Sequence, residues 1–363
     1  MSSLIVEVCK VDNIIKHPNA DRLSIIGVKG WNCIVGLDQY KVGDMVVFVP
    51  PDCIIPPEMI EKYNLEYLKH NGRTGTIKLR GAVSQGLILD LPEGKWNVGD
   101  DVASTLGITK YEPPEPGFAV RGSNMVSKKK LNPAFDKYTE IENIKNYNTV
   151  FKNGDLVVAT EKIHGANSRF GNLEIFVSKN QPILFRLQKW FEKKLLKRTH
   201  EFVYGSHNVQ ISFHTTKKNF YSEDIWGKIA QRYDLANKIP KDTIIYGEVY
   251  GDGIQDLTYG LKDDIDLVVF DVKQNGQYLN INDAHFIAET LGLKFVPFVY
   301  TGEFYDKLLE EFTGGESILC PGQIREGIVL RSFEETNNPI IGRKILKSIN
   351  AEYLARKNRT EFK

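Results

Sequence analysis

The stretch Thr160-Glu161-Lys162-Ile163-His164-Gly165-Ala166-Asn167 decides how this chain is interpreted. It continues the apolar run Leu156-Val157-Val158-Ala159, which is typical of a buried β-strand and places Lys162 at the strand end. A lysine amine can attack phosphorus when burial or neighbouring cations keep it partly neutral. The glycine three residues later allows backbone to pass close to a nucleotide. Because so short a pattern recurs by chance, its meaning depends on the partners that follow.

Attack on the α-phosphorus of a nucleoside triphosphate needs partners from the rest of the chain. The negative charge that develops is stabilised by cations and a metal ion, and the ribose and base need contacts of their own. Candidates occur downstream in the order Glu248, Phe270, Glu326, Lys344 and Lys347. Taken singly, each of these residues also suits a purely structural role, as an exposed edge glutamate, a core phenylalanine or part of a solvated basic strand. Their occurrence together favours a nucleotide site.

The composition is that of a globular protein. A chain of 363 residues is long enough for two domains. Its net charge of +1 argues neither for nor against nucleic acid. No apolar run approaches about 18 residues, and Met1–Ile5 lacks the basic start of a signal peptide. The four cysteines show no C-x-x-C spacing, so we expect neither a zinc site nor disulfides, and a cytoplasmic location.

Residues 1–108 are expected to form a first domain made mostly of strands. Turn-forming residues separate alternating or apolar runs, as in a small β-barrel, at 6–11, 45–49 and 75–79. The connector His17–Leu23 is interpreted as a turn in which Asn19 or Asp21 bonds nearby backbone.

Residues 109–145 are expected to be a linker. Three prolines within Glu112–Gly117 cannot continue a helix or a central strand. The triple lysine Lys128–Lys130 is interpreted as a solvated segment, or as a phosphate contact if the protein binds nucleic acid.

From residue 146 the pattern changes to mixed α/β. Apolar runs predict strands near 156–160, 244–250, 267–272 and 327–331. Residues 183–198 predict a basic amphipathic helix. Three interpretations of this helix stay open: its apolar face packs on the domain, it lies on a membrane surface, or its apolar face packs while its basic face meets a phosphate backbone.

These motifs together resemble the covalent nucleotidyltransferases, and among them the ATP-dependent RNA ligases. Motifs I, III, IIIa, IV and V of that superfamily resemble the segments at 161–167, 246–248, 269–271, 326–330 and 344–347. Lys-Ile-His-Gly-x-Asn and Gly-Glu-x-x-Gly-x-Gly-Ile-Gln are more similar to RNA ligases than to DNA ligases. The first hundred residues resemble the N-terminal OB-like module of one RNA ligase branch. DNA ligases and capping enzymes instead carry their OB domain after motif V, where this chain has only residues 348–363.

The resemblance implies an α+β fold, in which an OB-like β-barrel precedes an α/β nucleotidyltransferase (ATP-grasp-like ligase) domain with antiparallel sheets at 146–363. It implies that ATP adenylylates Lys162, that AMP passes to a 5′-phosphate, and that a 3′-OH displaces AMP, with Mg²⁺ or Mn²⁺ as cofactor. We expect a monomer that seals nicks in duplex RNA, as in RNA repair, without a membrane partner. The alternatives are a non-catalytic OB-type RNA-binding protein with a decayed transferase domain, or a DNA ligase or capping-type enzyme.

The resemblance also implies residue roles. Glu248 would hold the ribose, Glu326 and Glu248 would organise the metal ion, and Lys347 would neutralise the α-phosphate. With Lys162, these form the implied catalytic set. Phe270 would stack on adenine. Gly165 would let its loop close on the nucleotide and Arg169 would contact phosphate; the other residues assigned to nucleotide binding are Glu161, Ile163, Asn167 and Lys344.

Two motifs of this sequence, the first and the last, depart from the family pattern. His164 stands where many superfamily members have aspartate, and a neutral imidazole does not bind hydrated magnesium as a carboxylate does. The motif V lysines are three apart, so on a regular strand they would face opposite sides. Arg343 or Ile345, rather than Lys344, would then share a face with Lys347.

Overall fold

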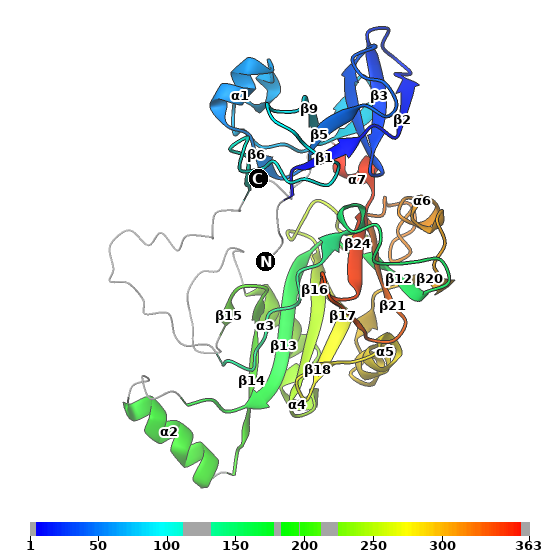
Figure 1. Cartoon of the computed structure of the whole chain (residues 1–363). Helices are drawn as coiled ribbons and strands as arrows, with labels where there is room; N and C mark the ends of the chain where they lie inside the picture. The colour runs from blue at the N-terminus through cyan, green and yellow to red at the C-terminus, as the bar shows by residue number, and fades with distance from the viewer. Residues whose placement is uncertain (1–4, 112–131, 178–182, 196, 212–223, 357–363) are drawn as a thin grey trace. The chain divides into compact units, whose positions relative to one another are not determined.

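The computed structural model describes residues 5–111, 132–177, 183–195, 197–211 and 224–356. Most of the expected linker, including Lys128–Lys130, lies outside these ranges. The chain forms two compact units (Figure 1), of which the first comprises Met1–Glu115, Glu142–Phe151 and Lys347–Lys357 and the second Pro116–Ile141, Lys152–Leu346 and Asn358–Lys363. Parts of the expected linker and of the expected second domain therefore group with the N-terminal unit.

The first unit consists mainly of short antiparallel strands, as the sequence predicts. Its sheets are β1-β5-β9, β2-β3-β4, β7-β8 and β10-β6. The strands are β1 (Glu7–Lys10), β2 (Asn13–Lys16), β3 (Leu23–Val28), β4 (Trp31–Gly36), β5 (Met45–Val49), β6 (Cys53–Ile54), β7 (Thr76–Leu79), β8 (Ala82–Gln85), β9 (Leu87–Leu89), β10 (Thr109–Lys110) and β11 (Glu142–Asn143). The helical segments are α1 (Pro57–Lys62), η1 (Glu66–Leu68), η2 (Ile144–Asn146) and α7 (Ala351–Leu354).

Strand β5 separates two cores in this unit. Alternate side chains of a strand point to opposite faces, so Val47 and Val49 join one buried cluster while Val46 and Phe48 join the other. These four side chains are at most 3% exposed. Burying each contributes about 1.5–3 kcal/mol relative to exposure.

The connector between β2 and β3 is a turn, but its hydrogen bonds differ from those predicted. His17 is buried; its Nδ1 accepts from the Asn19 N–H at 3.1 Å, and its Nε2 lies 3.1 Å from the carbonyl oxygen of Leu79. The Asn19 amide donates to the carbonyl of Arg80 at 3.0 Å. The turn is therefore tied to β7 across the sequence, which a local capping pattern could not show.

The second unit contains a large sheet in the order β15-β14-β13-β16-β17-β18. Neighbouring strands in this order run antiparallel, and β19 lies parallel beside β17. The strands are β13 (Ala166–Glu174), β14 (His200–Ser206), β15 (Gln210–Ile211), β16 (Thr243–Gly251), β17 (Ile265–Gln274), β18 (Gln277–Tyr278) and β19 (Lys294–Phe295).

A smaller sheet carries the start of the Lys162 motif. Strand β12 (Leu156–Lys162) pairs antiparallel with β20 (Phe298–Glu303) on one side and β21 (Gly327–Ser332) on the other. Strand β24 (Ile345–Ile349) lies next to β21, and the boundary between the two units falls within β24. The hairpin β22 (Asn337–Asn338) and β23 (Gly342–Arg343) and the helix α6 (Leu308–Phe312) complete this region.

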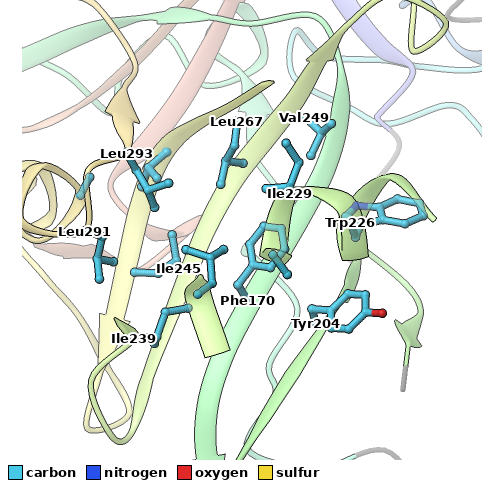
Figure 2. Close-up of a cluster of buried hydrophobic side chains, with 14 of the residues drawn as sticks. Phe170, Tyr204, Trp226, Ile229, Ile239, Ile245, Val249, Leu267, Leu291 and Leu293 are labelled. Carbon is cyan, nitrogen blue, oxygen red and sulfur yellow. The ribbon is translucent and has the colours of Figure 1, made fainter. Parts of the chain in front are cut away.

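One face of the large sheet is covered by helices α3 (Ile225–Arg232), α4 (Leu235–Lys238) and α5 (Ile281–Thr290). Figure 2 shows Phe170, Ile245 and Leu267 of three adjacent strands packed with Ile229 of α3. None of these four side chains is exposed. The predicted strands at 156–160, 244–250, 267–272 and 327–331 are confirmed as β12, β16, β17 and β21. The helix-covered face explains the apolar composition of β16 and β17, which belong to the large sheet.

The predicted amphipathic helix is confirmed as α2 (Ile183–Lys194). The side chains of Ile183, Leu187, Trp190 and Phe191 are each at least half exposed. These four described apolar side chains therefore do not pack on the domain, as two of the three open interpretations would require.

Candidate active site

Lys162 and Glu326 meet because of strand register. In the antiparallel β12–β21 ladder, Lys162 is the partner of Gly327. Glu326 directly precedes Gly327, so its carboxylate is delivered to the end of β12, where it forms an ion pair with Nζ of Lys162. The Glu326 side chain is only 1% exposed, whereas that of Lys162 is 28% exposed. The amine is thus held at a strand end and still reachable.

His164 joins Glu326 to a second carboxylate. Its Nε2 lies 2.8 Å from Oδ1 of Asp256, and its Nδ1 lies 4.0 Å from Oε2 of Glu326. The backbone N–H of His164 donates to the Tyr259 hydroxyl at 2.7 Å, which fixes the loop itself. A buried imidazole between two acidic side chains explains why His164 occupies a position where a carboxylate is expected.

The loop after β16 holds the loop after β12. Asp256 contacts His164, and the Gln255 amide donates to the carbonyl of Gly165 at 3.3 Å. Neither Asp256 nor Tyr259 was predicted from the sequence as a site residue. A signal was present in the glycines that open this loop, since Gly251 and Gly253 adopt the positive φ angles of 125° and 73°.

Gly165 is needed because the two loops lie so close together. A Cβ added there would lie 2.3 Å from the carbonyl oxygen of Val249 and 2.9 Å from Cγ of Glu248. Contacts this short would force the strand end to shift. The structure therefore supplies a packing reason for this glycine, and its role in letting the loop close on a nucleotide stays a prediction.

Glu161 presents a buried acceptor. Its Oε2 accepts the backbone N–H groups of Ile318 and Leu319 at 2.8 and 3.2 Å. Its other oxygen is buried and has no hydrogen-bond partner in the described part of the chain. Leaving a buried polar atom unpaired costs about 1–3 kcal/mol. The arrangement suits a ligand that donates a hydrogen bond, such as the exocyclic amine of a base.

The face of the large sheet opposite the helices carries three predicted residues. Asn167 and Glu248 are direct partners in the β13–β16 ladder. Oδ1 of Asn167 is buried without a hydrogen-bond partner in the described residues. Phe270 of β17 points away from the helix-covered core and packs with the buried Tyr138, their ring centroids being 4.8 Å apart. Strand pairing thus brings Asn167 and Glu248 together on this face.

Arg169 does not have the geometry of a phosphate contact. It is 1% exposed, and its guanidinium donates to the carbonyls of Ser206 and Phe135 at 2.9 and 2.8 Å. Its Cζ lies 4.2 Å from the centroid of the Phe135 ring. The predicted phosphate role is therefore replaced by a structural one, namely tying residue 135 to the sheet.

The cations near motif V are also engaged within the fold. Arg343 is buried and binds Asp271 at 2.9 Å and Glu335 at 2.6 Å. Lys344 forms an ion pair with Asp155 at 2.7 Å, which removes the support for its nucleotide role. A bend at Lys344 separates β23 from β24, so the assumed alternation of faces is interrupted between Arg343 and Ile345. Within β24, Ile345 and Lys347 are two residues apart, as the sequence argument required. Lys347 is partly buried on β24, and its catalytic role stays a prediction.

The acidic residues of the site are suited to a metal ion that is bound jointly by the protein and by the phosphates of a nucleotide. No group of three or more His, Cys, Asp and Glu side chains in the described ranges could by itself hold a metal ion. Magnesium is usually bound by one or two carboxylates together with substrate phosphates and water. Glu326 and Glu248 are carboxylates of the kind this requires, so the residues fit a metal that arrives with the triphosphate.

The comparison with known families decides the identity of this arrangement. The model of the RNA ligase family matches residues 155–349. The chain belongs to the RNA ligase family. A model of an OB-fold domain matches residues 5–91. The fold prediction is confirmed: an N-terminal OB-fold domain precedes a mixed α/β domain with antiparallel sheets.

Solved RNA ligase structures share this fold. The ligase resembles Naegleria gruberi RNA ligase with PPi (TM-score 0.67, 21% identity) over 97% of its own length and 98% of the other chain. A lysine-to-alanine mutant of that enzyme with ATP and Mn gives the same values. A glutamate-to-alanine mutant with AMP and Mn gives a TM-score of 0.66 and 22% identity over the same shares. A comparison with curated proteins found no match.

Within the described ranges, none of the ligase's helices is both long enough and apolar enough to cross a membrane.

Proposed function

We propose that this ligase uses ATP to join 3′-OH and 5′-phosphate RNA ends through a lysyl-AMP intermediate on Lys162. The observation that carries the proposal is the reachable amine of Lys162 at the end of β12, paired with the buried Glu326. The Naegleria ligase structures that contain PPi, ATP or AMP add support, because these are the product, substrate and transferred group of such a step.

In the first step Nζ of Lys162 attacks the α-phosphorus, a P–N bond forms, and pyrophosphate leaves. An ion pair favours the charged form of lysine. The amine must therefore separate from Glu326 and lose its proton before attack. A divalent metal ion held by Glu326 and Glu248 would neutralise phosphate charge. Lys347, if it reaches the α-phosphate, would do the same with its ammonium group.

The base and ribose would be held by the residues around this lysine. The unpaired oxygen of Glu161 can accept a hydrogen bond from the exocyclic amine of adenine. Guanine carries no donor at the same ring position. Phe270 offers a ring held in place by Tyr138. Glu248 would bind ribose hydroxyls beside Gly165.

The two later steps move the AMP group and close the strand. The 5′-phosphate of the RNA displaces Lys162 and takes the AMP, and the 3′-OH then attacks that phosphate and releases AMP. We propose nicked duplex RNA as the substrate, in RNA repair, because OB-folds commonly bind nucleic acid and the chain has one before its transferase domain.

The test is labelling followed by sealing. The full-length ligase is incubated with α-labelled ATP and Mg²⁺, and then offered nicked RNA and nicked DNA duplexes. We expect an acid-labile protein–AMP adduct that is absent in Lys162→Ala, and preferential sealing of the RNA nick. A protein that binds RNA but forms no adduct with any nucleotide would instead be a non-catalytic RNA-binding protein.

A further inference from the structure

Helix α2 exposes the side of the helix that would normally be buried. Figure 1 shows α2 beyond the ends of β13 and β14. The exposed fractions of its apolar side chains lie between 50% and 71%, for Ile183, Leu187, Trp190, Phe191 and the following Leu195. We call these five residues the α2 apolar face. A contiguous apolar surface of this kind indicates a binding surface.

The described residues on the covered side of α2 are polar. Lys189 and Glu192 are only 12% and 13% exposed, and Nζ of Lys189 lies 3.0 Å from Oε2 of Glu201 on β14. Lys193 pairs with Glu174 at the end of β13 at 3.1 Å. At 3.6 residues per turn, Lys189 and Glu192 project from the side of the helix opposite Leu187. Ion pairs to the β13–β14 hairpin therefore turn the apolar face outward.

Basic residues surround the α2 apolar face. Arg186, Lys194 and Lys197 are exposed, and no acidic side chain in the described part of the chain forms an ion pair with them. The excess positive charge next to an apolar surface calls for a partner that is both apolar and anionic.

Three kinds of partner do not meet both the apolar and the anionic requirement. A phosphate backbone of RNA would satisfy the cations but gain little from the aliphatic Ile183 and Leu187. A second copy of the helix would satisfy the apolar face but bring like charges together. A groove on a protein would have to bury the charge of Lys194, which projects from the same side of the helix as Ile183 and Leu187, two turns beyond Leu187.

An anionic lipid surface meets both requirements, because it offers an apolar interior and negatively charged headgroups. At a bilayer interface, a lysine within the apolar arc lays its stem along the acyl boundary while its ammonium reaches the headgroups. Trp190 lies where the apolar arc meets Arg186 and Lys193, the position at which an amphipathic ring sits at headgroup level. Outward Leu, Ile, Phe and Trp with Lys and Arg beside them are typical of helices that lie in the interface plane.

We propose that α2 binds the surface of an anionic lipid membrane through the α2 apolar face and its flanking basic residues. The helix lies in the interface without spanning it. This proposal departs from the sequence-based expectation that the protein has no membrane partner. It does not depend on the proposed ligase activity, since α2 holds none of the residues around Lys162.

The experiment is vesicle sedimentation of the full-length ligase. Vesicles of phosphatidylcholine alone are compared with vesicles that also contain phosphatidylglycerol. We expect binding to the anionic vesicles only, reduced about tenfold or more in Leu187→Glu/Phe191→Glu. Arg186→Glu/Lys194→Glu should also lose binding and its salt dependence. The matched control is Phe286→Glu on α5, where an equally exposed apolar residue (67%) lies outside the surface and should leave binding unchanged.

Thermal unfolding checks that each variant is folded, and the unfolding temperature should be unchanged. Absence of wild-type binding to anionic vesicles would overturn the proposal. Equal losses in the control and the α2 variants would also overturn it. If the α2 variants lost RNA binding or dissociated a dimer without any vesicle binding, the surface would belong to RNA or to a second copy instead.

Discussion

Lys162 and Glu326 form an ion pair across two antiparallel strands, although 164 positions separate them in the chain. The register of β12 and β21 places Gly327 opposite Lys162 and so fixes the glutamate beside the amine. The amine of Lys162 is thus positioned by the backbone hydrogen bonds of a sheet.

Glu326→Gln should strongly reduce formation of the lysyl-AMP adduct. The substitution keeps the side-chain shape but removes the charge that orients the amine and that would bind a metal ion. Removal of one such electrostatic group costs about 10²–10³-fold in rate. The measurement is the initial rate of labelling with α-labelled ATP, with thermal unfolding as the control for folding. An unchanged rate would exclude Glu326 from the reaction.

Asp256→Asn should reduce the same rate by a smaller factor. Asp256 lies 2.8 Å from the imidazole of His164, and we expect it to act through that contact. Partners that orient a functional side chain are worth about 10–100-fold. A separate measurement of the KM for ATP and of the rate at saturating ATP tests this, because a positioning residue should change the rate more than the KM. A loss confined to KM would instead make Asp256 a nucleotide contact.

Glu161→Gln should weaken the preference for ATP. The unpaired oxygen would become, in part, an amide donor, which cannot accept from the exocyclic amine of adenine. We expect about a tenfold loss of labelling efficiency with ATP, which corresponds to one hydrogen bond of about 1.4 kcal/mol. Competition between ATP and GTP for labelling measures the change. If both nucleotides were affected equally, Glu161 would hold the loop at Ile318 and not read the base.

Lys344→Ala should affect stability and leave adenylylation intact. The hydrogen bond from Lys344 holds the pKa of Asp155 below its ordinary value. The pair therefore stabilises the fold above the pKa of the unfolded carboxyl, and this contribution is lost as pH falls through the lowered folded pKa. Because both side chains are partly exposed, we expect only about 0.2–1 kcal/mol.

The measurement is the free energy of unfolding of wild type and Lys344→Ala across the acid range. The difference should be present at neutral pH and shrink at low pH. If Lys344→Ala lowered the labelling rate and left the stability unchanged, Lys344 would instead be a nucleotide-binding residue.

The sequence predicted what depends on local pattern and chain order. Alternating apolar residues identified the strands, and the order of Lys162, Glu248, Phe270 and Glu326 indicated the family. It did not predict the role of Asp256, because a loop contact with His164 has no periodic signal. Arg169 was assigned to phosphate from the family resemblance, and the sequence does not distinguish an arginine that binds a ligand from one that donates to backbone carbonyls.

Two further points depended on geometry that the sequence does not show. The bend at Lys344 interrupts the alternation of faces between Arg343 and Lys347. The amphipathic pattern of α2 identified a helix correctly, but a pattern cannot say which side meets the protein. Ion pairs of Lys189 and Lys193 with the hairpin decide that orientation, and they join residues from different elements.

Peptide mapping by mass spectrometry tests most directly whether Lys162 carries the AMP group. The full-length ligase is incubated with ATP and Mg²⁺, digested, and searched for AMP-bearing peptides. We predict AMP on Lys162 and its loss when nicked RNA with a 5′-phosphate is added. An unmodified Lys162, or AMP on a different residue, would contradict the proposed mechanism.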